Sequence, residues 1–138
     1  MTLRPGIFFL ILSLMAPPAL AQDWALDGID PVAYGTQNAA IPGRVDLVTF
    51  WRGKEWHFAS EQNREAFESN PKAYALGFDG YCVVALSEGR LEPGNPRYFV
   101  NIGGRTYLLR SKQSYRRIIA DQRDILTRAT SVWTRLQR

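Results

Sequence analysis

The chain has 138 residues, a formal net charge of +4 and a single cysteine, Cys82. This length predicts one domain, and a lone cysteine excludes an internal disulfide. The charge is uneven, because residues 22–110 carry 9 basic and 11 acidic side chains while residues 111–138 carry 7 and 2.

The N-terminal segment has the three regions of a secretory signal peptide. Arg4 supplies a basic start, an apolar run covers residues 7–16, and Ala-Leu-Ala at residues 19–21 provides the small side chains that a signal peptidase accepts. The apolar run is short, since a membrane-spanning helix needs about 20 residues. We therefore predict that residues 1–21 are a cleaved signal peptide, and that a periplasmic or secreted domain covers residues 22–138.

The first part of this domain indicates a hairpin followed by helices. Residues 45–51 and 54–59 are rich in Val, Thr, Phe and Trp, and an Arg-Gly pair separates them, which predicts two antiparallel strands. Ser60 is a good N-cap for the helix that follows. Asn70 and Pro71 interrupt that helix and start a short second one, which Gly77 ends.

The second part contains another hairpin. Residues 80–86 are apolar and fit either a buried strand or a helical turn, because periodicity does not separate the two in so short a run. A loop rich in Gly and Pro follows, and residues 97–110 then predict a hairpin with Gly103 and Gly104 at its turn. We detect no internal repeat, so the pattern predicts one small α+β domain of β-hairpins packed with helices.

From about residue 111 the apolar residues recur at helical spacing, which predicts an amphipathic C-terminal helix packed on its own domain. The arginines at 116, 117, 123 and 128 fall mostly off the apolar stripe. This basic face fits solvent, an anionic membrane surface or an acidic partner protein, whereas a nucleic-acid partner is not expected for an exported protein. The basic residues of this face are Arg116, Arg117, Arg123 and Arg128.

Three segments of the chain together resemble one known family. They are DGIDPVAYG at residues 27–35, WHFASEQNREAFESNPKAY at residues 56–74 and DGYC at residues 79–82. These segments resemble the YHS domain family, in its small exported branch. The Tyr-His-Ser pattern that names the family corresponds here to Trp56, His57 and Ser60. The resemblance implies metal binding, since family members fused to heavy-metal transport ATPases have cysteines where this chain has Ala33, Ala59 and Asn63. Alanine has no donor atom and a neutral amide is a poor ligand for soft ions, so that ligand set is not carried over.

Four residues remain as ligand or metal candidates: His57, Cys82, Tyr81 and Asp30. His57 and Cys82 could hold Cu(I), while a structural zinc site normally needs four ligands. Their alternative roles are structural, with Cys82 as a small buried hydrophobe and His57 as a hydrogen-bonded imidazole on a strand. A cysteine hydrolase built on Cys82, His57 and Asp79 or Asp30 lacks any local signature, and we expect no enzymatic activity.

The aromatic content is high, and most of these side chains are expected in the core. A few could line a groove for a small apolar or planar ligand or for a partner's side chain. Taken together, the sequence predicts a non-catalytic YHS-type binding module. The alternatives are an accessory copper or zinc protein and a docking protein that uses its basic C-terminal helix. The aromatic residues considered are Trp51, Trp56, Phe58, Tyr74, Phe78, Tyr81, Tyr98, Phe99 and Tyr107.

Overall fold

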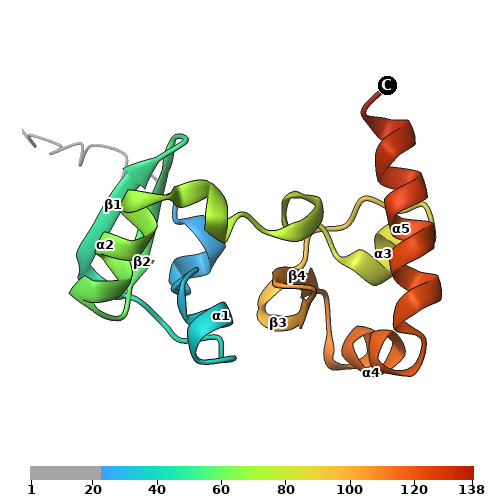
Figure 1. Cartoon of the computed structure of the whole chain (residues 1–138), viewed down its shortest axis with the longest axis horizontal. Coiled ribbons are helices and arrows are strands. Elements are labelled where there is room, and N and C mark those ends of the chain that lie inside the picture. The colour runs from blue at the N-terminus through green and yellow to red at the C-terminus, as the bar shows by residue number, and fades with distance from the viewer. Residues whose placement is uncertain (1–22) are drawn as a thin grey trace, which may run out of the picture.

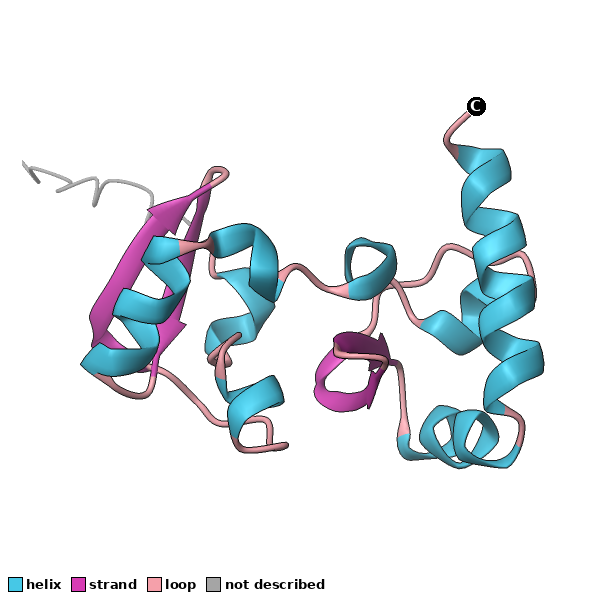
Figure 2. Ribbon diagram, in the orientation of Figure 1, coloured by secondary structure: helices cyan, strands magenta, loops and turns pink. Residues whose placement is uncertain are grey.

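Two β-hairpins, each followed by a helix, organise the chain (Figures 1 and 2). The computed structural model describes residues 23–138. The elements of its first half are η1 (Ala25–Gly28), α1 (Ala33–Thr36), β1 (Arg44–Trp51), β2 (Lys54–Phe58), α2 (Glu61–Ser69) and η2 (Pro71–Tyr74). Those of its second half are η3 (Gly77–Gly80), α3 (Val83–Ser87), β3 (Asn95–Ile102), β4 (Arg105–Leu109), α4 (Lys112–Ala120) and α5 (Gln122–Leu136). The predicted α+β class is confirmed.

The two halves are a structural repeat, so the expectation of no internal repeat was wrong. Each half has a 3-10 turn, a short helix, an eight-residue strand, a five-residue strand and a nine-residue helix, in that order. The hairpins share a register irregularity near the start of the first strand. The helices share a serine N-cap, in which Ser60 and Ser111 accept hydrogen bonds from the main-chain N–H three residues later.

The most specific match between the halves is a run of left-handed backbone. Leu26 and Asp27 have φ of 55° and 51°, and Phe78 and Asp79 have φ of 53° and 51°, each pair followed by a left-handed glycine. A bulky side chain in this region is uncommon and strained. Both halves therefore keep the same unusual run of left-handed residues, which we call the chain reversal of each half.

The repeats pack side by side, and different elements cover their outer faces. The first hairpin with α2 forms one end of the molecule, while β3 and β4 lie between α1 and the C-terminal helices (Figure 1). Tyr34 of α1 donates a 2.6 Å hydrogen bond to the carbonyl of Pro96, and its ring lies 4.8 Å from that of Phe99. Among residues 23–138, no helix covers Val45 and Phe50 of β1, which remain 72% and 76% exposed.

The C-terminal part differs from the sequence prediction in one respect. The predicted helix from residue 111 is amphipathic and packs on its own domain, with Ile118, Ile125 and Ala129 buried. It is nevertheless two helices, because Asp121 adopts an extended φ of −145° between α4 and α5. The sequence left residues 80–86 open between a strand and a helical turn; residues 83–86 belong to a buried helix, α3, against which α5 packs.

The predicted signal peptide, residues 1–21, lies outside the described residues. Within residues 23–138, no helix has both the length and the apolar character needed to cross a membrane.

Candidate binding site

Asp30 is the centre of a buried hydrogen-bond network in the first repeat. Its side chain is fully buried, and Oδ1 accepts from the main-chain N–H groups of Val32 at 2.8 Å and Ala33 at 3.4 Å. Oδ2 accepts from the N–H of Ala59 at 2.8 Å and from Nδ2 of Asn63 at 2.7 Å. The carboxylate therefore ties α1 to the start of α2, and four donors compensate its loss of hydration.

The donor set around Asp30 does not fit a soft metal ion. The three positions at which the family resemblance implies cysteines do gather around this carboxylate, since all three contact it. However, they contribute N–H donors in place of thiolates, and both carboxylate oxygens are already engaged. Among residues 23–138, no group of three or more His, Cys, Asp and Glu side chains is placed to hold a metal.

His57 is buried in a different environment from the hydrogen-bonded imidazole expected. Its side chain is 1% exposed, and its ring packs against that of Trp24 with centroids 4.3 Å apart and the ring planes tilted by 48°. Nε2 lies 2.9 Å from Oε1 of Glu55, but the two groups are not aligned as a hydrogen bond, and neither ring nitrogen has a hydrogen-bond partner among the described residues. Gly43 lies against the main chain of His57 so closely that a Cβ there would come within 2.4 Å of its carbonyl carbon.

Cys82 and Tyr81 belong to the second repeat. Cys82 follows the second chain reversal as Asp30 follows the first, and its side chain is fully buried in the apolar cluster beneath α5. The ring of Tyr81 lies 6.1 Å from that of Trp133. The clusters that hold Cys82 and His57 are built from different elements, so metal binding by this pair stays a prediction without a contact to support it.

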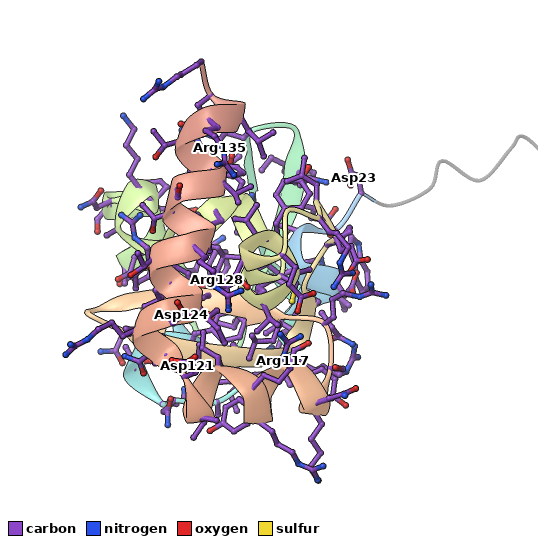
Figure 3. The ribbon with its side chains drawn as sticks, turned by 90° about the vertical axis from the view of Figure 1, so that its right-hand side faces the viewer. Asp23, Arg117, Asp121, Asp124, Arg128 and Arg135 are labelled. Carbon is purple, nitrogen blue, oxygen red and sulfur yellow. The ribbon has the colours of Figure 1, made fainter. Side chains whose placement is uncertain are left out.

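The basic C-terminal face is partly neutralised by neighbouring acids. Arg117 pairs with Glu88, and Arg128 pairs with Asp124 at 2.7 Å. Figure 3 shows Arg117, Arg128 and Arg135 spread along the C-terminal helices with Asp121 and Asp124 among them. Arg116 and Arg123 form no ion pair with another described residue. Docking of this face to an anionic membrane or an acidic protein stays a prediction.

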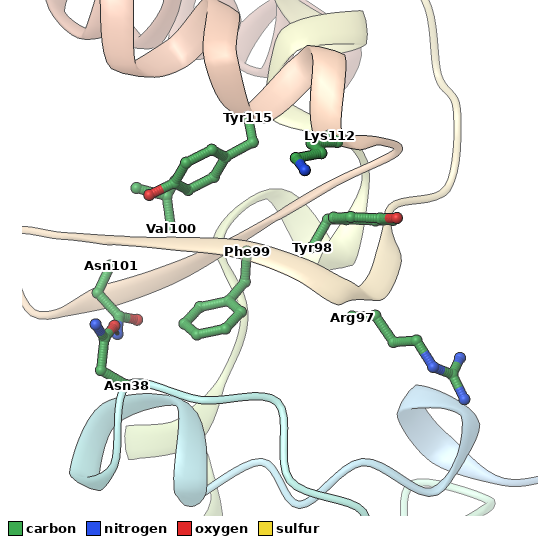
Figure 4. Close-up of a pocket in the computed structure, with 8 residues that line it drawn as sticks. All are labelled: Asn38, Arg97, Tyr98, Phe99, Val100, Asn101, Lys112 and Tyr115. Atoms are coloured by element: carbon green, nitrogen blue, oxygen red, sulfur yellow. Dashed lines mark hydrogen bonds between the residues drawn. The ribbon is translucent and has the colours of Figure 1, made fainter.

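A groove with a volume of about 660 Å³ runs along β3. We call it the β3 groove. In Figure 4 the side chains of Tyr98 and Val100 point to one side of the strand, toward α4, and those of Phe99 and Asn101 point to the other, toward Asn38. The residues that line it are Asn38, Arg97, Tyr98, Phe99, Val100, Asn101, Lys112 and Tyr115.

The β3 groove is cationic and aromatic. Arg97 and Lys112 line it, no acidic residue does, and neither cation forms a salt bridge within the described part of the chain. Tyr98 and Tyr115 are 37% and 42% exposed, so part of each side chain is in contact with solvent. Side chains of this kind favour a ligand that combines negative charge with apolar or planar groups.

The first repeat lacks this charge at the equivalent positions. Counting from the shared hairpin turn and N-cap, Asp46 corresponds to Arg97 and Glu61 to Lys112. Both acids are already paired, Asp46 with Arg44 and Glu61 with Arg64. The two repeats therefore share a backbone arrangement and carry opposite charges at these two positions.

Sequence reasoning found part of this groove. Tyr98 and Phe99 were among the aromatic residues considered for a ligand groove, but Arg97, Lys112 and Asn38 were not singled out. Arg97 and Lys112 are fifteen positions apart along the chain, and only the packing of α4 over the second hairpin brings them to one surface. Aligning the two halves would have revealed the charge reversal.

Comparison with models of protein families, with curated proteins and with solved structures found no match to this chain. The likeness to the YHS domain therefore stays a prediction from the quoted segments.

Proposed function

We propose that this protein is an exported, non-catalytic binding module of the YHS type, and that the β3 groove binds its ligand. The observation that carries the proposal is that Arg97 and Lys112 line this groove beside exposed tyrosines and form no salt bridge with any residue in the range 23–138. A carboxylate ligand would gain charge-assisted hydrogen bonds there without displacing an internal partner.

The environments of the reactive side chains support a role in binding. Cys82 has no exposed surface, and its neighbours are apolar. His57 is equally enclosed, and Asp30 has all its contacts within the fold. A nucleophile and a base need access to substrate and to each other, and neither condition is met by these positions.

The ligand expected at the β3 groove is an acidic peptide or a comparable polycarboxylate. The proposal can be tested by titrating the ¹⁵N-labelled purified protein with a blocked hexapeptide of glutamates and recording amide chemical shifts. We expect shifts concentrated at residues 97–101 and 112–115, and weaker binding as salt is raised, because exposed charges are screened.

Two variants and a control locate the binding. Arg97→Gln and Lys112→Gln should each weaken the peptide by roughly two- to fivefold, the range of exposed charge pairs. Arg123→Gln, which removes a cation from the C-terminal face, should leave binding unchanged. If only Arg123→Gln lost binding, the peptide site would lie on the C-terminal helices and not in the β3 groove. The absence of any chemical-shift change at millimolar peptide would refute the proposal.

A further inference from the structure

The floor of the β3 groove is the free edge of a strand. Five consecutive residues, 97–101, line the groove, although their side chains alternate between the two faces of the hairpin. Consecutive residues share one surface only along the edge of a strand, where the main chain itself is exposed. Among residues 23–138, β4 is the only strand paired with β3.

The register shows which main-chain groups point into the groove. Gly103 and Gly104, both left-handed, form the two-residue turn, so Ile102 and Arg105 make the first hydrogen-bonded pair. Hydrogen-bonded and non-hydrogen-bonded pairs alternate in an antiparallel ladder, which places Phe99 and Asn101 in non-hydrogen-bonded pairs. Their N–H and C=O groups therefore point away from β4, toward the groove.

The main-chain N–H and C=O groups of Phe99 and Asn101 have no hydrogen-bond partner within the described chain. None of the main-chain hydrogen bonds outside the ladders involves Phe99 or Asn101. Helix α1 and helix α4 flank the two faces of the hairpin and leave the edge open between them (Figure 4). An unpaired edge of this kind is a template for another strand.

We propose that the β3 groove binds an extended polypeptide segment of a partner protein, which adds to β3 as a further strand and carries acidic residues at the end near Arg97 and Lys112. This inference rests on the proposed function and names its ligand. Five residues of strand span roughly 17 Å, so a segment of about five residues fills the edge. Main-chain bonds to Phe99 and Asn101 supply affinity, and the two cations select the acidic end.

The two cations lie on opposite sides of the edge, which defines the pattern of the segment. Arg97 extends toward the η1 side and Lys112 lies on α4 (Figure 4). Neighbouring residues of an extended segment point to opposite faces, so two consecutive acidic residues meet both cations. The residues that precede this acidic pair lie beside Phe99 and Val100, where β-branched side chains fit.

The first hairpin provides an internal control for selectivity. The turn at Arg52 and Gly53 sets the same register, so the main-chain groups of Val48 and Phe50 point away from β2, along the edge of β1 that no other strand of residues 23–138 pairs with. That edge carries Asp46 and the α2 residue Glu61 where β3 has its cations. An acidic segment should therefore add to β3 and avoid β1, because like charges are unfavourable.

Amide hydrogen exchange tests strand addition directly. The probe is a blocked hexapeptide, acetyl-Val-Thr-Val-Glu-Glu-Thr-amide, added to the purified protein. On saturation we expect exchange at the amides of Phe99 and Asn101 to slow by about tenfold or more, because they gain hydrogen bonds. The amides of Val48 and Phe50 should exchange at unchanged rates.

Two N-methylated versions of the peptide separate main-chain pairing from charge attraction. Methyl groups on alternate residues remove the N–H groups along one edge of the peptide, and shifting them by one residue removes those on the other edge. Strand addition predicts that one version binds about tenfold or more weakly and the other within about twofold of the parent. Equal binding of both versions, with no protection at Phe99 and Asn101, would refute strand addition while leaving acidic-ligand binding in the groove intact. If neither the glutamate peptide nor this probe bound, the β3 groove would be refuted as a binding site.

Discussion

Replacing Asp30 with asparagine perturbs the network that ties α1 to α2. The substitution keeps the size and shape of the side chain but replaces one carboxylate oxygen with an NH₂ group. Oδ1 and Oδ2 each accept hydrogen bonds from two N–H donors. In either orientation of the asparagine amide, its NH₂ group therefore faces two of these donors and cannot accept from them.

The expected cost follows from those unpaired donors. Each buried donor that loses its acceptor costs about 1–3 kcal/mol, and the Asn variant leaves two of them unsatisfied. Relief of the buried negative charge offsets part of this loss, so we expect the free energy of unfolding to fall by about 3 kcal/mol. A domain of this size has about 5–15 kcal/mol in total, so the variant should still fold.

Chemical denaturation followed by tryptophan fluorescence measures the change. Trp51 and Trp56 pack against Phe67 of α2, so their emission reports this part of the fold. Asp121→Asn is the matched control, since Asp121 is exposed and makes no side-chain cap hydrogen bond, and its midpoint should not move. A loss below about 1 kcal/mol for Asp30→Asn would refute the reasoning that its four donors depend on the carboxylate.

Three further changes test the packing between the repeats and the second repeat itself. Burial raises the pKa of Tyr34 above its ordinary value, so the stability that Tyr34 contributes is complete below the ordinary pKa and declines as the pH rises beyond it. Tyr34→Phe should remove this alkaline decline in the melting temperature. At neutral pH the same variant should cost about 1–3 kcal/mol, because the carbonyl of Pro96 loses its hydrogen bond. Hydrogen bonds from Arg90 and, second, from Arg117 lower the pKa of Glu88, so the melting temperature should fall as the pH drops below the ordinary glutamate range. Arg117→Gln should flatten part of that decline, and an unchanged acid profile in the variant would contradict the pairing. Gly94→Ala places a Cβ 2.3 Å from a side-chain carbon of β4 and should cost about 1–3 kcal/mol in urea denaturation, whereas Gly35→Ala, with open space around it, should not lower stability by a comparable amount.

The local elements were predictable because their signals are local. Alternating apolar residues and two-residue turns placed both hairpins, and Ser60 marked the start of α2. The break at Asp121 was missed because the apolar pattern continues through it, and α4 ends there as α2 ends at Asn70. The repeat was missed because its signals are sparse, chiefly an Asp-Gly pair at each chain reversal and a serine at each N-cap.

The candidate residues show where local signals stop. His57, Cys82, Tyr81 and Asp30 were grouped by chemical type and by family resemblance, but their surroundings depend on which elements pack around them. Asp30 and Cys82 occupy corresponding places in the two repeats, one filled by a hydrogen-bonded carboxylate and the other by an apolar core. The apolar run around Cys82 already indicated a small buried hydrophobe, whereas nothing in the residues next to Asp30 indicated the four donors that surround its carboxylate.

The sequence by itself determined the α+β class, the two hairpins and the amphipathic character of the C-terminal segment, since each depends on residues close together in the chain. Tertiary structure alone decided that the halves repeat, that α1 and α4 flank the second hairpin, and that Arg97 and Lys112 share a groove. The physical reason is that hydrogen bonding and periodicity act over a few residues, whereas a binding surface depends on how distant elements bury their apolar faces against one another.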